Sequence, residues 1–444
     1  MRTTDDLAFV ELLEKLRKDP AKAHPLLHQE VSRISLENGV QAAFNLLLRI
    51  EISFGWRRPT LALYDHAIHF IGGAQKYGLT MAATLQDAFD ITILANKEVG
   101  LEDFRRWYGL DLSRCRIKVL KLPYYEKKEV AHLDPALVTG QEPNPFHPVS
   151  RESGNYDIFI NNSMNEMVYP LANISVLVCH FPERRPRIYF YADRYDYIVY
   201  NSRYTSKWIA KKWKIPSHVH IYPYVEMKAS AGEKPKKKLL LSVARFEVEG
   251  TKRQKEMIET FLRLHTFYPE AIEGWKFILA GGSNSGNRYL ARLEELLRQH
   301  PRPNIELRVN ISAAELESLY EEATLFWHLC GIVQDDPSAV EHFGMTTIEA
   351  MEHGVVPIVY DGGGLPEIVD DGVNGFRVKS RAMLLERTLE LLRNPSLVSE
   401  LSRAARRKAQ EFSREKFEAR VRAFFDRLLC QYTMAQRSTP TSLD

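Results

Sequence analysis

Two glutamates, Glu341 and Glu349, stand on either side of a Phe-Gly turn in the segment EHFGMTTIE. Gly344 interrupts the chain there, and the residues that follow predict a helix that begins near Met345 and ends at Gly354. Glu341 is therefore expected in the loop before this helix, and Glu349 on the helix itself. A carboxylate accepts two hydrogen bonds, which suits the vicinal diol of a ribose or a hexose.

The start of the same helix offers a second kind of chemistry. The backbone amides of Gly344, Met345 and Thr346 would form its positive end, where a phosphate is favoured. One short segment could in this way hold a sugar, a diphosphate and a ribose. The alternative is structural: Glu341 pairs with a surface cation, and Glu349 has no special partner.

Two cations stand at the end of the apolar stretch KLLLSVAR and just beyond it, in the segment SVARFEVEGTKRQ. Arg245 comes directly after the expected strand, and Lys252 stands at the start of the next helix. They could clamp a diphosphate, because Arg offers a planar fork and Lys a movable point charge. Two exposed surface cations would give the same pattern.

Glycines follow three of the expected strands, where they would let the backbone approach a ligand closely. They are Gly72-Gly73, Gly281-Gly282 and Gly362-Gly363-Gly364. None of the three sets fits the GxGxxG or P-loop pattern, so a dinucleotide or Walker-type site is disfavoured. Any single pair is more simply a tight turn, whereas three sets facing one cleft favour a ligand.

The elements that must position these residues come from two runs of alternating strands and helices. Short apolar segments recur from residue 58 onward, and helical patterns such as SKWIAKKWK lie between several of them. The first run contains PTLALYDHAI, FDITILAN, RIKVLKL, YDIFINN, ISVLVCHF, YDYIVYN and VHIYPYV, and the second contains KLLLSVAR, WKFILAGG, NIELRVN, ATLFWHL and VVPIVYD. This alternation predicts an α/β fold of two Rossmann-like, doubly wound domains facing a cleft, with ligands beyond the strands' carboxyl ends.

Domain boundaries follow from the same pattern. We predict a helical N-terminal extension at 1–55, a first domain at 56–225, a polar linker at 226–238 and a second domain at 239–412, with a last helix at 413–430 packing back on the first domain. The apolar helical run VQAAFNLLLRIEI in the extension could be a peripheral membrane anchor or simply part of an extension packed on the first domain. Packing is favoured, because a surface anchor usually carries more lysine on its polar face.

Composition narrows the class of protein. Of 444 residues, 45% are apolar and 26% charged, and no apolar run reaches the roughly 18 residues of a membrane helix. Four separated cysteines without a CxxC pair argue against a disulfide framework or a zinc site. The charged N-terminus does not look like a secretory signal, and a net charge of +3 is too small to favour nucleic acid. We expect a cytoplasmic protein, either free or in peripheral contact with the inner face of a membrane, without a metal site.

The segment EHFGMTTIEAMEHGVVPIVYDGGGLPEIVDDGVNGF closely resembles the E-x(7)-E segment of the family-4 retaining glycosyltransferases of the GT-B fold. GGAQKYG at 72–78 resembles their N-terminal glycine loop, and VARF with KRQ resembles their Arg/Lys pair. YIVYNSRYTSKWI and FILAGG also fit. The resemblance spans roughly residues 60–430, and the E-x(7)-E segment is its most specific part.

The resemblance implies a role for each candidate residue. Arg245 and Lys252 would neutralise a diphosphate leaving group, and Glu349 would hold the ribose diol. Glu341 and the turn Phe343–Met345 would contact the donor sugar. The second domain would bind the nucleotide sugar, and the first would bind the acceptor.

Two further positions enter through the resemblance. Gly72 and Gly73 would approach the phosphate from the other domain. His180, in VLVCHFP, would face the donor sugar or the acceptor, although a lone histidine at a strand end is as readily structural. The glycine loop departs from the family by carrying Gln75 where Glu is frequent, and the Arg/Lys spacing is slightly wider than usual.

The implied activity is the transfer of a hexose, with retention and without a metal or other cofactor, from a UDP- or GDP-linked sugar. The acceptor would be a hydroxyl of a sugar, a glycolipid or another molecule. The sequence has no D-x-D, and Arg245, Lys252 and the helix end would replace a metal electrostatically. A GT-B-fold epimerase or sugar phosphorylase, or a non-catalytic nucleotide-sugar-binding subunit, remains as an alternative.

Overall fold

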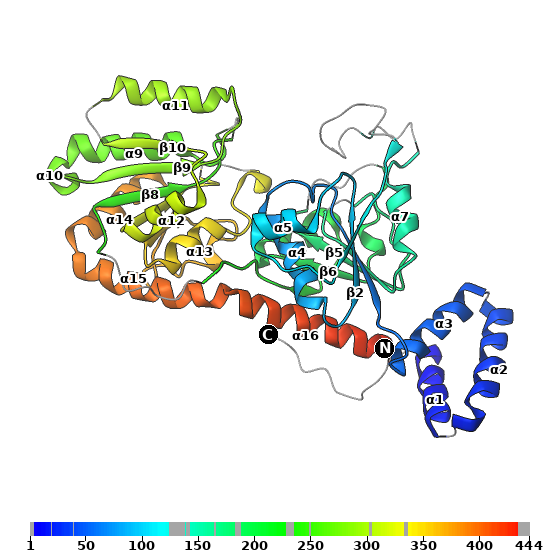
Figure 1. Ribbon diagram of the computed structural model, residues 1–444. Helices are drawn as coiled ribbons and strands as arrows, with labels where there is room; N and C mark the ends of the chain where they lie inside the picture. The colour runs from blue at the N-terminus through cyan, green and yellow to red at the C-terminus, as the bar shows by residue number, and fades with distance from the viewer. Residues whose placement is uncertain are drawn as a thin grey trace. The chain divides into compact units, whose positions relative to one another are not determined.

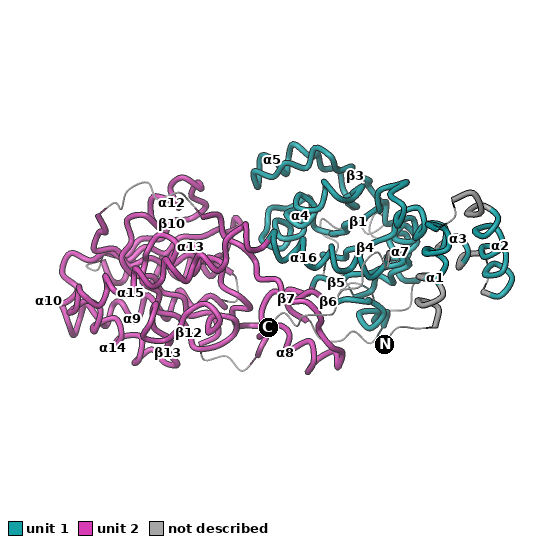
Figure 2. The backbone as a smooth tube through the Cα atoms, turned by 90° about the horizontal axis from the view of Figure 1, so that it is seen from below, with its two compact units in different colours: residues 1–178, 186–197, 418–444 teal, residues 179–185, 198–417 magenta. Residues whose placement is uncertain are grey.

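The computed structural model describes residues 4–18, 20–38, 40–123, 138, 143–163, 166–182, 188–227, 235–247, 250–301, 304–332 and 336–433. The chain divides into two compact units (Figure 2). The first comprises residues 1–178, 186–197 and 418–444, and the second comprises residues 179–185 and 198–417. Residues 198–225, which the sequence assigns to the first domain, thus cluster with the second unit. Of the linker expected at 226–238, residues 228–234 lie outside the described residues.

The N-terminal extension, which the sequence predicts to be helical, consists of three helices among its described residues (Figure 1). They are α1 (Thr4–Lys18), α2 (Pro20–Asn38) and α3 (Val40–Ser53). Pro20 opens α2 directly after α1 because its missing N–H is not needed in a first helical turn. The apolar run in α3 packs within the extension, since Leu46 and Ile50 share a buried cluster with Phe9 and Leu13 of α1.

The first sheet has seven strands in the order β3-β2-β1-β4-β5-β6-β7. Each of the seven apolar segments predicted for this part of the chain contains one strand. They are β1 (Thr60–Tyr64), β2 (Asp90–Ala95), β3 (Arg116–Val119), β4 (Ile158–Asn161), β5 (Ile174–Cys179), β6 (Tyr197–Tyr200) and β7 (Val219–His220). The helices described in this part of the chain are α4 (Gly73–Leu85), α5 (Leu101–Tyr108), α7 (His147–Ser153), α8 (Arg203–Trp208), the short turn η2 (Ala192–Arg194) and the π-helical turn η3 (Ile209–Trp213).

The second sheet has six strands in the order β10-β9-β8-β11-β12-β13, and all neighbours pair in parallel. Its strands are β8 (Leu239–Val243), β9 (Lys276–Gly281), β10 (Ile305–Val309), β11 (Leu325–His328), β12 (Val356–Tyr360) and β13 (Phe376–Val378). Its helices are α9 (Gln254–Phe267), α10 (Pro269–Ile272), α11 (Arg288–Gln299), α12 (Ala313–Glu322), α13 (Met345–Glu352), α14 (Arg381–Arg393) and α15 (Pro395–Ala409), with the short turns η4 (Pro337–Ala339), η5 (Leu365–Glu367) and η6 (Gln410–Phe412). The sequence predicted the first five strands and missed β13.

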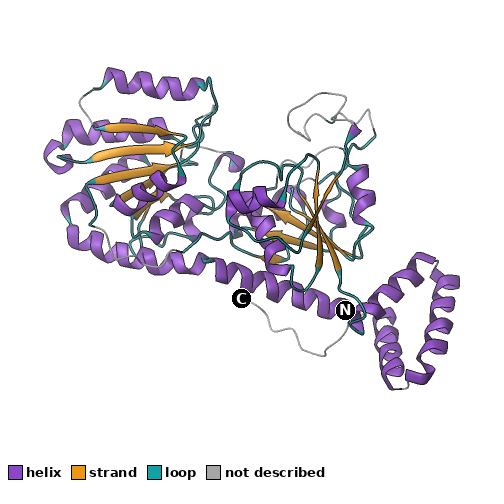
Figure 3. Cartoon of the chain, viewed as in Figure 1, coloured by secondary structure: helices purple, strands orange, loops and turns teal. Residues whose placement is uncertain are grey.

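Both faces of the second sheet are buried under helices, which confirms the doubly wound prediction (Figure 3). Successive strand residues point to opposite faces. Phe277 and Trp327 therefore join the cluster that contains α9, whereas Ile278 and Phe326 join the cluster that contains Tyr320 of α12. The ends of these strands are consequently held firmly, and residues just beyond them are well placed to form a site.

The last helix, α16 (Arg414–Thr433), buries the apolar face that the sequence predicted. Its buried residues are Phe417, Val421, Phe424, Phe425 and Leu428. Within the first unit, the Phe425 ring lies 6.1 Å from that of Phe89, and the Phe424 ring lies 5.4 Å from that of Tyr197. In the part of the chain that the structure describes, no helix is both long and apolar enough to span a bilayer.

Candidate active site

Three charged or polar side chains meet at the carboxyl edge of the second sheet. Lys252 precedes α9, His328 ends β11, and Glu341 lies in the loop before α13. Lys252 Nζ lies 3.0 Å from Glu341 Oε2, and His328 Nε2 lies 3.3 Å from the same oxygen. Because β8 and β11 are neighbours, the segments that follow them converge at this edge. The structure thus brings two of the predicted residues together and adds a histidine that the sequence reasoning missed.

The Lys252–Glu341 pair is largely shielded from solvent, with side-chain exposures of 18% and 19%. Burial alone would raise the pKa of Glu341, but Lys252 and His328 outweigh it and hold that pKa well below its usual range. Burial alone would lower the pKa of Lys252, but the Glu341 carboxylate outweighs it and raises that pKa. The two side chains therefore form an ion pair at neutral pH.

The two oxygens of Glu341 differ in their surroundings. Both contacts, from Lys252 and from His328, fall on Oε2. Among the residues that the structure describes, none donates a hydrogen bond to Oε1. Cys330 Sγ lies 3.7 Å from Lys252 Nζ, and burial raises the pKa of its thiol to about 12, so it stays protonated. Oε1 therefore keeps unused hydrogen-bond acceptor capacity.

Arg245, the other predicted cation, follows β8 but does not join this cluster. Its guanidinium pairs with Glu247 Oε1 at 3.0 Å, and its side chain is 78% exposed. Its backbone is fixed, because Gln254 Nε2 donates to the Arg245 carbonyl oxygen at 3.0 Å. Because its side chain is largely exposed, Arg245 can turn toward an anion, while its backbone at the end of β8 stays in place.

The start of α13 has the backbone conformation that the sequence led us to expect. Gly344 caps the helix with φ +116°, a value that favours glycine. Met345 and Thr346 occupy the first helical positions and are half-buried. The first amides of a helix have no acceptor within it. Gly354 follows the helix with φ +70°, which confirms the predicted C-terminal stop.

The glycines after β12 make room for the loop that carries Glu341. A Cβ on Gly363 would lie 2.1 Å from the Glu341 carbonyl oxygen, and one on Gly364 would lie 2.2 Å from the His342 carbonyl oxygen. The Gly364 amide also donates to the Glu341 carbonyl oxygen at 2.8 Å. The close approach that these two glycines permit is thus between two loops of the protein.

Glu349 lies on α13, where Tyr320 holds it. The Tyr320 hydroxyl donates to Glu349 Oε2 at 2.8 Å, and the Tyr320 ring stacks on His353 at 5.6 Å. His353 Nε2 lies 2.7 Å from Glu317 Oε1. Burial lowers the pKa of His353, but Glu352, the Glu349 carbonyl oxygen and Glu317 outweigh it and raise it to about 9. Sequence reasoning missed Tyr320, because only the tertiary fold places α12 beside α13.

His180 and Phe181 follow β5 and belong to the second unit, as Glu341 does. The Phe181 ring stacks on His342 with centroids 3.9 Å apart and planes 6° from parallel. Burial, with a smaller contribution from His342, lowers the pKa of His180 to about 4. Burial likewise lowers the pKa of His342 to about 4. Both imidazoles are therefore neutral at pH 7.

Phe343, another predicted site residue, is buried in the cluster around Ile348.

Gly72 and Gly73 lie in the first unit, where Gly72 caps α4 in an extended conformation. The Gly72 amide donates to the Tyr108 hydroxyl at 2.8 Å. Gln75 Nε2 donates to Asp65 Oδ2 at 3.2 Å, and burial raises the pKa of Asp65. The amide of Gln75 thus donates to a buried carboxyl group, which an ionised glutamate at this position could not do.

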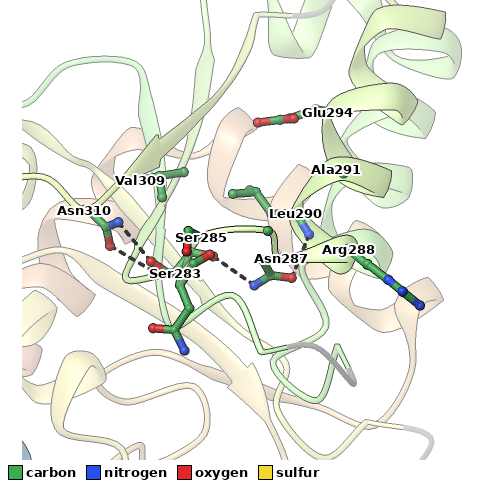
Figure 4. Close-up of a pocket in the computed structure, with 11 residues that line it drawn as sticks. Ser283, Ser285, Asn287, Arg288, Leu290, Ala291, Glu294, Val309 and Asn310 are labelled. Carbon is green, nitrogen blue, oxygen red and sulfur yellow. Dashed lines mark hydrogen bonds between the residues drawn. The ribbon is translucent and has the colours of Figure 1, made fainter.

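A pocket of about 550 Å³ opens beside the ends of β9 and β10 (Figure 4). Ser283 and Asn310 are joined by two hydrogen bonds of 2.9 Å, and Asn287 donates to Ser283 Oγ at 2.9 Å. Arg288 points away from this polar group (Figure 4). The pocket lies at the same edge of the sheet as Lys252 and Glu341. Within the described residues, no group of three His, Cys, Asp or Glu side chains could hold a metal ion.

The fold defined by these two units is that of the GT-B glycosyltransferases. The protein HepE of Anabaena, solved in complex with UDP and glucose, aligns over 83% of this chain and 100% of its own, with a TM-score of 0.61 and 15% identity. Sucrose-phosphate synthase of Thermosynechococcus elongatus aligns over 84% of this chain and 100% of its own, with a TM-score of 0.58 and 16% identity.

Residues 223–409 match the family model "Glycosyl transferases group 1". The GDP-Man:Man(3)GlcNAc(2)-PP-Dol alpha-1,2-mannosyltransferase of Dictyostelium discoideum is 25% identical over 250 residues, which cover 53% of this chain and 48% of that protein. Human alpha-1,3/1,6-mannosyltransferase ALG2 is 27% identical over 257 residues, which cover 53% of this chain and 59% of that protein. The chain thus spans about half the length of these curated relatives. Together with the fold, the matches support a glycosyltransferase.

Proposed function

We propose that the protein is a retaining, metal-independent glycosyltransferase of family 4, which moves a hexose from a UDP- or GDP-linked sugar to an acceptor hydroxyl. The observation that carries this proposal is the shielded Lys252–Glu341 ion pair at the carboxyl edge of the second sheet. The start of α13 lies next to it in the chain, and Glu349 follows on the same helix. Cation, helix amides and carboxylates are the groups that a diphosphate-linked sugar requires.

Each charged residue has a separate task in the proposed reaction. Lys252, Arg245 and the amides of Met345 and Thr346 stabilise the negative charge that grows on the departing diphosphate. Glu349, oriented by Tyr320, accepts hydrogen bonds from the ribose hydroxyls. The ribose is bound alike in the ground state and the transition state, so this contact mainly sets affinity.

Glu341 acts on the sugar itself. Its Oε1 accepts a hydrogen bond from a sugar hydroxyl, and its charge stabilises the positive character of the sugar as the bond between C1 and the phosphate oxygen breaks. The acceptor oxygen then bonds to C1 on the face from which the diphosphate leaves. The acceptor proton passes to the diphosphate oxygen, so no protein nucleophile is consumed and the configuration at C1 is retained.

The pocket beside β9 and β10 is the proposed place for the base of the nucleotide. Three strand spacings, about 14 Å, separate β10 from β11 across the sheet. A nucleotide sugar laid along this edge would put its base near Asn310, its diphosphate near Lys252 and its sugar near Glu341. The polar lining by Ser283, Asn287 and Asn310 suits a hydrogen-bonding base.

We assign acceptor binding to the first unit and to His180. Gly72 and Gly73 would approach the donor phosphate, and the neutral imidazole of His180 can donate or accept a hydrogen bond to a sugar hydroxyl. We would test GDP-Man and Man(3)GlcNAc(2)-PP-Dol first, because both are in the name of the Dictyostelium discoideum relative. A cytoplasmic location with contact to a membrane surface belongs to the same proposal.

A donor panel tests the proposal. Purified protein is incubated with GDP-mannose, UDP-glucose, UDP-N-acetylglucosamine and ADP-glucose, each with lipid-linked and free sugar acceptors. We expect one nucleoside diphosphate to be released with formation of a glycoside whose anomeric configuration, measured by proton NMR, matches that of the donor. An inverted product would contradict the retaining route. Interconversion of nucleotide sugars without transfer would favour an epimerase, and phosphate-dependent release of sugar phosphate would favour a phosphorylase.

A further inference from the structure

His328 is a buried side chain at the candidate site to which neither the sequence motifs nor the comparisons assign a role. It is the last residue of β11, and its side chain is only 4% exposed. Its Nε2 lies 3.3 Å from Glu341 Oε2, while Nδ1 has no hydrogen-bond partner among the described residues. With Nδ1 unpartnered, the ring proton that contacts Glu341 belongs on Nε2.

The two donors to Glu341 Oε2 differ in how firmly they are held. His328 belongs to a strand that pairs on both sides, with β8 and with β12, and is itself in register with Val359. Lys252 stands outside regular structure, in the turn before α9, and carries its ammonium on four flexible methylenes. The histidine is therefore the fixed donor, and the lysine is the movable one.

The proposed function makes conflicting demands on Lys252. Its ammonium must contact the diphosphate, yet in the structure it is the charge partner of Glu341. When the ammonium turns toward the phosphates, Glu341 loses part of that partner in a shielded place. A carboxylate left without a donor there would shift in position or take up a proton.

We propose that His328 is a positioning residue that holds Glu341 in its reactive orientation while Lys252 is shared with the diphosphate. The hydrogen bond from Nε2 fixes Oε2 and so directs Oε1 toward the donor sugar. This inference rests on the proposed glycosyl transfer and adds to it the residue that keeps the first glutamate of the pair in place. It does not require His328 to touch the substrate.

The test compares two substitutions at His328. His328→Gln keeps an N–H donor, whereas His328→Phe keeps the ring volume and removes the donor. We expect His328→Phe to lower kcat roughly 10- to 100-fold, the factor that corresponds to a lost hydrogen bond to a charged group. The affinity for the nucleoside diphosphate should stay within about twofold, because Glu341 acts on the sugar. His328→Gln should recover part of the lost kcat.

A double-mutant cycle with Glu341→Gln separates positioning from general damage. If His328 acts through Glu341, His328→Phe should cost little more once Glu341 is already changed. His265, half-buried on α9, offers a matched control, and His265→Phe should leave kcat unchanged. Wild-type kcat in His328→Phe would overturn the proposal. So would full additivity with Glu341→Gln, or equal losses in kcat and in nucleoside diphosphate binding.

Two other results of this test have separate meanings: misfolding of His328→Phe, and absence of glycosyl transfer by the wild-type protein. If His328→Phe fails to fold, His328→Asn and His328→Gln carry the cycle, and a loss of kcat in both that is the same with and without Glu341→Gln overturns the inference. If the wild-type protein consumes no nucleotide sugar, the proposed function fails. The coupling between His328 and Glu341 can then be measured by denaturant unfolding, where its absence would overturn the contact itself.

Discussion

Replacing Lys252 with methionine probes the ion pair at the centre of the site. The change removes the ammonium and fills nearly the same space. It leaves Glu341 with His328 as its one remaining donor among the described residues. Breaking a buried pair from one side costs about 3–5 kcal/mol. The pair here is 18% and 19% exposed and His328 stays in contact, so we expect a loss of about 2–3 kcal/mol in the free energy of unfolding.

The double variant Lys252→Met/Glu341→Gln separates stability from activity. It contains no uncompensated charge, so most of the lost stability should return. Activity should not return, because the cation that faces the diphosphate is missing. We expect kcat to fall about 10²- to 10³-fold in Lys252→Met, and at least as far in the double variant.

Guanidinium unfolding at pH 7 and steady-state turnover of the donor measure the two effects. The reasoning is refuted if Lys252→Met unfolds at the wild-type denaturant concentration, since the pair would then contribute nothing. It is also refuted if the double variant turns over at the wild-type rate.

Three other predictions concern the two glutamates, the charge of His353 and the need for a metal ion. Glu349→Gln should weaken nucleoside diphosphate binding, whereas Glu341→Gln should lower kcat and leave that binding nearly unchanged; the opposite pattern, seen by calorimetry and kinetics, would reverse the two roles. Because the pKa of His353 is raised to about 9, its stabilisation is complete below about pH 6.5 and is lost as the pH rises through 9, so the unfolding free energy should fall over that range in the wild type and not in His353→Gln. Excess EDTA should leave turnover unchanged, and a loss that Mn²⁺ or Mg²⁺ restores would contradict the metal-independent route.

The sequence allowed most of the frame around the site to be predicted. Continuous apolar strands between helices have few alternative arrangements, so both parallel sheets and the position of Glu341 before α13 were predicted correctly. The strand β13 was missed because its three residues, Phe376–Val378, form no apolar run of their own. Its place depends on pairing with β12, which is a tertiary contact.

The partners within the site were harder to predict. His328 is a single histidine at the end of ATLFWHL, and nothing in its spacing connects it to Glu341 across 13 residues of chain. The glycines Gly363 and Gly364 predict that another group approaches the backbone closely at this point. Only the fold identifies that group as the loop of Glu341 and His342. Sequence patterns specify conformational freedom and burial, whereas the identity of a neighbour depends on topology.

The most direct test of the central claim is calorimetric titration of the protein with UDP and with GDP. The claim is that Lys252 and Glu349 bind the diphosphate and the ribose of a nucleotide. We expect one of the two nucleotides to bind at a single site per chain, and Lys252→Met and Glu349→Gln each to weaken it about tenfold or more, as loss of a hydrogen bond to a charged group does. Absence of binding by both nucleotides, or an affinity that neither substitution changes, would contradict the account.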